Sequence, residues 1–365
     1  MVMSFPLSYC PHGEQVLNRL RALYEKRSPE IVLAKMNVPG PALQDFHRTH
    51  PPGFCEYPDL RERVAFWDAS TREHIAVDDD SIPSAYLTEL DQGLYGGLFG
   101  GEVRFLCDPS TGWISSMVVP LLNDWSEFDA LSFRTDHEWY RRYVNELNVF
   151  VTAARGKYGI SHFILINHLN FIFELVGATR TYMALEDDPE RVRRAIDLAH
   201  AVNLNLHQTF FDKASLLEGG TCGYTIEWLP GRIISESVDP FHMTSVDHFE
   251  RWGREPVERI FSQFDGGVTH IHGNGRHLLP AVSSLKGLKA IMLGDDKGWP
   301  RAFDILADVR RQVGDMPLVC EVEFPQFNRA LREHTLVGGV LYQVHDVPDV
   351  AAANRCMDVV RRYGV

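Results

Sequence analysis

The sequence predicts an α/β protein whose main domain is a (β/α)8 TIM barrel, and three observations support this prediction. First, short apolar segments rich in β-branched residues alternate with segments of helical period through the second half of the chain. Second, most of these apolar segments lack polar alternation, which is typical of parallel strands buried on both faces. Third, the strands recur every roughly 20–30 residues, a spacing that leaves room for one crossover helix after each strand.

The expected elements follow in order along the chain. Strands are expected at residues 160–167, 231–237, 266–272, 288–293, 316–322 and 338–344. Helices are expected at residues 187–211, 244–264, 275–285, 299–313, 325–335 and 348–364. Asp187 or Asp188 would cap the first of these helices, with Pro189 in its first turn. Residues 1–60 are expected to form an N-terminal helical extension packed on the barrel, which would span residues 61–365.

The composition fits one large globular fold and excludes several classes of protein. The chain has 365 residues, 45% of them hydrophobic, and a formal net charge of −13. Lysine and arginine are scattered singly, so neither nucleic acid nor an anionic membrane surface is an expected partner. The six cysteines lie far apart without a C-x-x-C motif, as in a protein with reduced thiols. Without a signal-like N-terminus or an apolar run of about 18 residues, the protein is expected to be cytoplasmic, with a homodimer left open.

Two histidines stand at the end of one expected strand, in the segment "GGVTHIHGNG". His270 and His272 are two residues apart, so their side chains project to the same side of the strand. Asp295 or Asp296 follows the next strand and His345 follows the last one, which places all of them on the C-terminal rim of a barrel. Imidazoles with a carboxylate are suitable ligands for zinc or a similar divalent ion. The alternatives are a core histidine beside a loop histidine, and aspartates that cap helices.

Three glutamates at strand ends are candidates for proton transfer. Alternation along the strand "LVCEVEF" sends Glu321 and Glu323 to one face and Cys320 to the other. Glu236 ends the strand "GRIISES". A glutamate at a barrel strand end suits a general acid or base, and a solvated end or an arginine partner is the alternative. Cys320 is expected to be a small buried hydrophobe.

Four further residues are candidates for contacts with a small-molecule substrate. Asn167 ends a strand and could hydrogen-bond a ligand, and Asp239 follows the strand that contains Glu236. Tyr224 could form a pocket wall, although a core position is the alternative. Asn274 belongs to "GNG", whose backbone amides could bind an anion.

Two segments carry a resemblance to a known family. "DPFHMTSVDHFERWGREPVERIFSQFDGGVTHIHGNG" and "GGVLYQVHDVPDVAAANRCMDVVRRYG" resemble the central and C-terminal blocks of the uroporphyrinogen decarboxylase-like superfamily. Shorter stretches such as "GGLFGGEVRF" and "LEDDPERVRRAID" are similar to upstream landmarks, so the resemblance covers about residues 60–365. It implies a (β/α)8 barrel with its site at the C-terminal rim.

The superfamily has two arms, and the resemblance is closer to one of them. The decarboxylase arm carries an arginine-rich stretch that is not recognisable here, where the chain reads "LAKMNVPGPALQDFHRTHPPGF". The other arm contains zinc-dependent methyltransferases that pass a methyl group between a corrinoid protein and a thiol. Its ligand pattern falls on His270, on His272 in place of a cysteine, on Asp295 or Asp296, and on His345 about where the last cysteine is expected.

The resemblance therefore implies a metal-dependent methyl or one-carbon transferase that acts with a separate corrinoid protein. Both thiolates of the family pattern are replaced by imidazoles, which leaves the metal a stronger Lewis acid. An oxygen-bearing substrate group, such as a carboxylate or a carbonyl, is then the expected metal ligand. A decarboxylase and a non-catalytic ligand-binding barrel are the alternatives.

Overall fold

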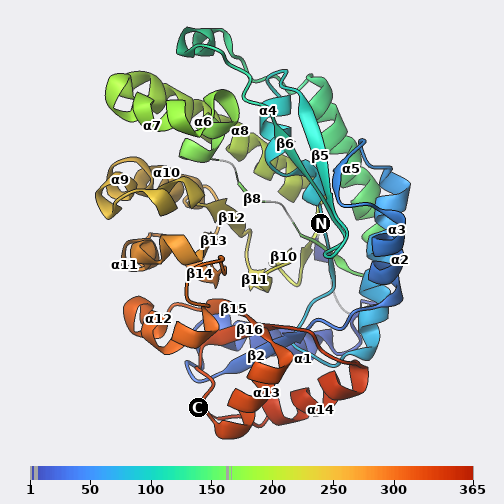
Figure 1. The fold of residues 1–365 in the computed structure, drawn as a ribbon. Helices are drawn as coiled ribbons and strands as arrows, with labels where there is room; N and C mark the ends of the chain where they lie inside the picture. The colour runs from blue at the N-terminus through green and yellow to red at the C-terminus, as the bar shows by residue number, and fades with distance from the viewer. Residues whose placement is uncertain (1, 4–6, 162–163, 166, 365) are drawn as a thin grey trace.

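The centre of the protein is a curved sheet of seven parallel strands, surrounded by helices (Figure 1). The computed structural model describes residues 2–3, 7–161, 164–165 and 167–364. The strand order is β2-β16-β15-β14-β13-β12-β8. These strands are β2 (Val32–Met36), β8 (Ile164–Leu165), β12 (Ile234–Ser237), β13 (Gly267–Ile271), β14 (Leu288–Leu293), β15 (Leu318–Glu323) and β16 (Val340–His345).

A further parallel pair of strands forms a separate two-stranded sheet. Strand β4 (Ser84–Tyr86) pairs with β7 (Gly159–Ser161), which comes shortly before β8 in the chain. Between β2 and β4 the backbone N–H of Asp80 donates to the carbonyl of Ala34 over 3.0 Å, and no ladder joins these two strands within the described ranges. The architecture is therefore TIM-barrel-like, with a seam between β2 and β4.

Helices follow the strands as the sequence predicts for crossover connections. Those of the second half are α8 (Pro189–Lys213), α9 (Val246–Trp252), α10 (Arg254–Phe261), α11 (Leu279–Ser283), α12 (Leu306–Val313), α13 (Phe324–Glu333) and α14 (Val350–Val360). The Asp188 side chain caps α8 by accepting from the Arg191 amide, with Pro189 in the first turn. The helix predicted over 244–264 is divided at Gly253, where an added Cβ would meet Phe249 and Phe241 at 2.7 and 2.8 Å.

The N-terminal part differs from the predicted helical extension. Residues 1–60 contain β2, which pairs with β16 in register from Val32 to Met36, so the central sheet begins well before residue 61. The helices of the first half are α1 (Gly13–Tyr24), α2 (Pro41–Thr49), α3 (Leu60–Glu73), α4 (Gln92–Gly97), α5 (Glu138–Ala154), α6 (His168–Val176) and α7 (Ala178–Asp187). An antiparallel sheet lies outside the barrel and is made of β3 (Gly53–Cys55), β5 (Val103–Asp108) and β6 (Trp113–Val118).

Alternation along the strands divides the apolar residues into two cores. The outer core packs between the sheet and the helices and includes Ala34, Ile291, Leu318, Cys320 and Val340. The inner core fills the barrel and includes Leu33, Val268, Ala290, Val319 and Leu341. Because side chains two residues apart share a face, the residues two positions further along also face the interior: Lys35, His270, Glu321 and Gln343. The barrel interior thus changes from apolar to polar toward the C-terminal strand ends.

A hairpin of β10 (Gly220–Gly223) and β11 (Glu227–Pro230) fills the apolar end of the barrel. Its Trp228 and Leu229 belong to the inner core. At the tip, Gln343 of β16 donates to the carbonyl of Thr225 over 2.8 Å. The tip also carries Glu227, which forms an ion pair of 2.8 Å with Lys35 of β2. The hairpin is therefore tied to the strands from inside the barrel.

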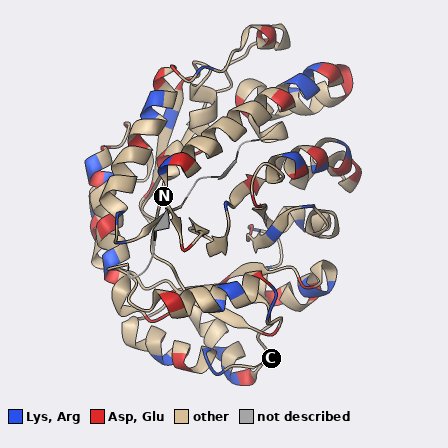
Figure 2. Ribbon diagram, turned by 180° about the vertical axis from the view of Figure 1, so that it is seen from behind, with Lys and Arg blue, Asp and Glu red and all other residues tan. Residues whose placement is uncertain are grey.

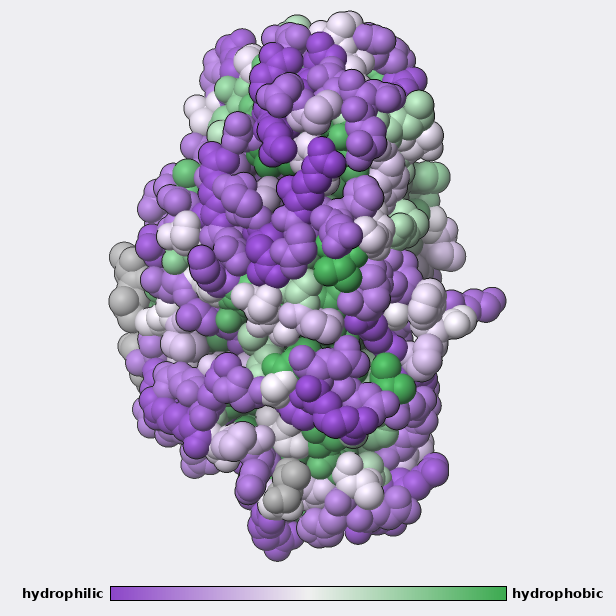
Figure 3. All heavy atoms as spheres, turned by 90° about the vertical axis from the view of Figure 1, so that its left-hand side faces the viewer, coloured by the Kyte–Doolittle hydropathy of each residue, from purple (hydrophilic) through white to green (hydrophobic). Residues whose placement is uncertain are grey.

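The surface is polar and of mixed charge. Figure 2 shows acidic and basic residues interspersed over the outer helices. On the face seen in Figure 3, hydrophilic side chains dominate and hydrophobic ones form small separate groups. Within the part of the chain that the structure describes, none of the helices has both the length and the apolar character needed to cross a membrane.

Two glutamates and one arginine are fully buried between α3, α5 and the segment before α4. Arg63 pairs with Glu89, and its guanidinium lies over the rings of Phe46 and Phe66 at 5.2 and 5.0 Å. Glu146 of α5 is 0% exposed. Burial, and then the nearby Glu89, raise the pKa of Glu146 well above its ordinary value of 4.5. The single guanidinium, that of Arg63, pairs with Glu89. The second carboxyl group, that of Glu146, therefore stays protonated.

We predict that Glu146→Gln stabilises the protein increasingly as pH rises. Above pH 4.5 the unfolded wild type releases the Glu146 proton while the folded state retains it, so wild-type stability falls with pH. Glutamine has no such proton, and the expected gain at pH 8 is on the order of 1–3 kcal/mol. Denaturant unfolding at pH 5 and pH 8 measures the difference, with exposed Glu333→Gln as control. A gain of equal size at both pH values would contradict the assignment.

Candidate metal site

The structure brings His270 and His272 together with Asp239. His270 lies in β13 and His272 directly follows it, while Asp239 follows β12, which pairs with β13 in register at Ser237 and His270. The Nε2 atoms of His270 and His272 are 2.8 and 3.9 Å from Oδ1 of Asp239. Ligand atoms of all three residues lie within 4.8 Å of one another. This set offers two imidazole nitrogens and one carboxylate oxygen, which fits a catalytic zinc or similar ion.

The charges at this cluster favour an ionised aspartate beside imidazoles. Burial opposes ionisation of Asp239, but His270 beside it holds the pKa of the carboxyl below its usual range. Burial likewise opposes charge on His270, and Asp239 raises the pKa of that imidazole overall. A divalent cation would take over this role of the protonated imidazole, because it binds the same carboxylate and neutral histidine.

A third histidine lies beside the cluster, and sequence reasoning missed it. His242 has its Nδ1 3.6 Å from Oδ1 of Asp239, and its buried Nε2 has no hydrogen-bond partner among the described residues. Burial lowers the pKa of His242 to about 4, so the ring is neutral at pH 7. The ring fits against Gly275, where an added Cβ would meet its Cδ2 at 2.1 Å. The signal in the sequence is the spacing D-x-x-H from Asp239 to His242, which one turn brings to the same side.

The two aspartates after β14 have different environments. Oδ1 of Asp296 is 3.1 Å from Nδ1 of His272, and the Asn274 amide donates to Asp296 over 3.3 Å. This contact leaves Nε2 of His272 free for a metal, as in carboxylate–histidine–metal arrangements. Asp295 instead contacts Arg276 at 2.9 Å and accepts from the Ala302 amide at 2.7 Å. The structure thus places Asp296, and not Asp295, next to the cluster.

The predicted ligand His345 and two of the predicted acids lie elsewhere on the rim. His345 is not part of the cluster, and its Nε2 is 4.0 Å from Oε1 of Glu321. Glu323 forms an ion pair of 2.9 Å with Arg301. Glu321 faces the barrel interior and is partly exposed. Of these acids, Glu321 is the one in a position to exchange a proton with a ligand in the barrel.

Glu236 and Asn167 are buried and do not line an open surface. Glu236 is 0% exposed and lies 3.3 Å from Nε2 of the equally buried His168. Asn167 donates to the carbonyl of Pro256 over 3.3 Å. Burial raises the pKa of Glu236, and His168 opposes that shift. This buried pair supports the end of β12, from which Asp239 projects three residues later.

Tyr224 and Asn274, the other two residues predicted to contact a substrate, lie in different parts of the structure. Tyr224 lines a cavity beside the C-terminal ends of β2 and β16, with Lys35 Nζ 4.5 Å from its ring centroid. Asn274 lies near the cluster, where its amide contacts Asp296 and its buried Oδ1 has no partner among the residues described.

Asp91, which interacts with the cluster, and Glu174, which interacts with Asp91, were not predicted from the sequence. Burial raises the pKa of Asp91 to about 7, with His270 opposing the shift and Asp239 adding to it. Burial and then Asp91 raise the pKa of Glu174 to about 8. Both groups therefore hold a proton close to neutral pH, which is typical of acids and bases in functional sites. They lie far from His270 in the chain, and nothing in their local sequence marks them.

We predict one divalent metal ion per chain, bound through Asp239, His270 and His272. Asp239→Asn should abolish binding, because it removes the only anionic group of the set. Asp296→Asn should weaken binding by roughly 10–100-fold, because His272 loses the carboxylate that orients it. Asp295→Asn is the matched control and should leave affinity within about twofold. Elemental analysis and chelator competition measure these values, and equal effects of Asp295→Asn and Asp296→Asn would contradict the geometry.

Comparisons with known proteins agree with the architecture. No model of a protein family matches the chain. No curated protein matches its sequence. Among solved structures, the chain is similar to a methyltransferase from Methanosarcina mazei, with 12% sequence identity and a TM-score of 0.62 over 95% of this chain and 98% of the other. At this identity the similarity shows a shared fold.

Proposed function

We propose that the protein is a metal-dependent transferase of a methyl or similar one-carbon group. The observation that carries this proposal is the cluster of Asp239, His270 and His272 at the C-terminal ends of β12 and β13, which is where TIM-barrel enzymes hold their reacting groups. The fold shared with a methyltransferase supports the class of reaction. We also propose that the strands close into a full eight-stranded barrel.

The proposed metal is zinc, held by three protein ligands with one position left for a substrate. A bound zinc ion would act as a Lewis acid on that substrate. Asp296 orients His272, and His242 closes one side of the site as a neutral imidazole. Asp91 is the proposed proton donor or acceptor, because its pKa of about 7 lets it serve in either role near neutral pH.

The substrate group proposed for the metal is an oxygen, and the proposed methyl carrier is a separate corrinoid protein. The cluster contains no cysteine, and a single carboxylate leaves the ion more positive than two thiolates would. The corrinoid partner comes from the resemblance of residues 239–275 and 338–364 to the methyltransferase arm of the uroporphyrinogen decarboxylase-like superfamily.

The test of the proposed reaction is methyl transfer from methylcobalamin by the zinc-loaded protein. We expect transfer to acceptors that bind the metal through oxygen, and we expect Asp239→Asn to lower the rate more than about 100-fold, or about 2.7 kcal/mol. Asp295→Asn again serves as the control. If the Asp239→Asn variant transfers methyl groups at the wild-type rate, the metal is not part of the reaction and the proposal fails.

The ligand preference of the metal has a separate test. Cobalt substituted for zinc gives an absorption spectrum that reports its ligands. We expect acetate to perturb this spectrum at lower concentration than 2-mercaptoethanol does in wild type, and the order to reverse in His272→Cys. Tighter binding of the thiol by wild type would restore the thiol methyltransferase interpretation.

A decarboxylase of uroporphyrinogen is the second function to which the resemblance points, and the structure disfavours it. Several substrate carboxylates require free, forked guanidinium groups. In this chain the basic residue of β2 that faces the barrel interior is Lys35, whose charge is already paired with Glu227. We predict no turnover of uroporphyrinogen near the rate of a typical enzyme, about 1 s⁻¹. Formation of decarboxylated porphyrinogens at that rate, followed by chromatography, would contradict this prediction.

A further inference from the structure

A cavity of about 540 Å³ opens beside the C-terminal ends of β2 and β16, away from the metal cluster. This volume lies within the range of small-molecule sites, roughly 300–1,000 Å³. Its apolar walls come from α2, α3, the segment after α3 and the hairpin, and include Leu43, Phe66, Trp67, Val77 and Tyr224. The rings of Trp67 and Tyr224 are edge-on to each other with centroids 6.1 Å apart. The cavity can therefore surround the apolar body of a small ligand.

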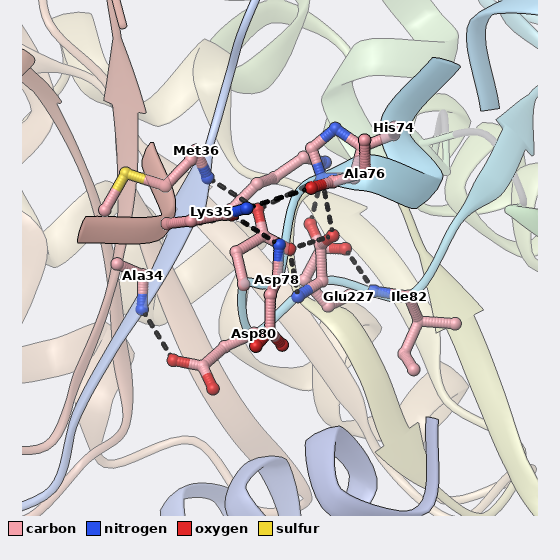
Figure 4. A network of polar contacts seen from close by, with 12 residues as sticks. Ala34, Lys35, Met36, His74, Ala76, Asp78, Asp80, Ile82 and Glu227 are labelled. Carbon is pink, nitrogen blue, oxygen red and sulfur yellow. Dashed lines mark hydrogen bonds and ion pairs between the residues drawn. The ribbon is translucent and has the colours of Figure 1, made fainter. Parts of the chain in front are cut away.

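Lys35 is the one lysine or arginine among the described residues that line this cavity, and its charge is already neutralised. Its Nζ is 2.8 Å from Oε1 of Glu227 and 3.3 Å from the carbonyl of Tyr224. Figure 4 shows Glu227 between Lys35 and the backbone amide of Ile82, to which its second oxygen is bonded. Burial opposes charge on Lys35, but Glu227 raises its pKa overall, so Lys35 stays charged. Lys35 therefore offers no net positive charge to a ligand.

The carboxylates around the cavity outnumber its cation. Besides Glu227, the lining contains Glu73 and Asp346, so three carboxylates face one ammonium and the formal balance is −2. Both oxygens of Glu73 accept from the Ala42 amide, which leaves its charge in place. Asp346 is exposed, and no cation in the described part of the chain lies within ion-pair distance of it. A carboxylate ligand would be repelled here and a cation attracted.

Two of these carboxylates are among the six described non-glycine residues with a positive φ angle. Glu227 and Asp346 have φ angles of 63° and 56°, in the left-handed region that non-glycine residues seldom adopt. Such conformations cost about 1–3 kcal/mol and are found where a side chain is held for binding or catalysis. Both strained residues belong to the same cavity wall, one from the hairpin and one from the end of β16.

We propose that this cavity binds a small organic cation, an ammonium group carried on an apolar body. Asp346 supplies the unpaired negative charge, and the apolar side chains of the cavity, Trp67 among them, can surround the body of the ligand. The site is separate from the metal cluster, because none of Asp239, His270 and His272 lines the cavity. The inference does not depend on the proposed transferase activity.

Calorimetric titration with three probes of one shape tests the proposal. Benzylammonium, benzyl alcohol and benzoate share a ring and differ in charge. We expect wild type to bind benzylammonium about tenfold more tightly than benzyl alcohol, and benzoate to bind least. Benzoate binding as tight as that of benzylammonium, or no heat from benzylammonium at about 10 mM, would overturn the proposal.

Two variants locate the binding in the cavity. Asp346→Asn removes the charge while asparagine tolerates the same left-handed backbone, so affinity for benzylammonium should fall about tenfold without a change of fold. Ser70→Trp places a large side chain into the cavity and should remove binding, with a circular dichroism spectrum like that of wild type showing that the variant is folded. Exposed Glu333→Gln is the charge-matched control and should bind as wild type. Undiminished affinity in Asp346→Asn, or in folded Ser70→Trp, would overturn the proposal.

Discussion

The two-residue alternation of parallel strands held in register is the constraint on which the rest of this structure depends. The strands of the seven-stranded sheet other than β8 send one set of side chains to the helices and the other set into the barrel. A slip of β13 by one residue would turn His270 and His272 toward the helices and bring Thr269 and Ile271 inside. The apolar contacts of Val268 and Ile271, one on each face, oppose such a slip. The position of the histidines therefore follows from the packing of their apolar neighbours.

The ion pair of Lys35 and Glu227 connects this sheet to the hairpin inside it. A buried pair adds little net stability, but removal of one partner leaves a buried charge and costs about 3–5 kcal/mol. The pair fixes the position of the hairpin. Glu227 also accepts from the Ile82 amide, so it joins β2, the hairpin and the segment before β4. These are the segments on either side of the seam that lacks a strand ladder. The pair therefore connects the two sides of the seam. It also neutralises Lys35, so this residue offers no free charge to a ligand.

The sequence predicted the elements that depend on local pattern, and it missed those that depend on tertiary contacts. The apolar strands from residue 231 onward and the helix capped by Asp188 appear where expected. The strand expected at residues 160–167 lies partly outside the described residues, which contain β7 and β8 in that range. The strand β2 was not expected, because Lys35 interrupts its apolar run and proline-rich sequence follows. The neighbourhood of His270 and His272 was predictable from their spacing, whereas Asp239 joins them only because a short turn after β12 points back toward β13. Asp91 depends on burial by distant segments, which no local pattern records.

With the proposed ion bound, the metal cluster and the cavity would carry opposite charge at two parts of one rim. A divalent ion with one carboxylate and neutral imidazoles would leave a net positive charge near β13, whereas the cavity beside β16 and β2 is lined by three carboxylates and one ammonium. Three strand spacings separate β13 from β16, or about 14 Å. Glu321 faces the barrel interior between them, within 4.0 Å of His345. The electric field between the two sites would orient a ligand that has an electron-rich group at one end and a cationic group at the other. The two proposed sites together would therefore select for dipolar molecules.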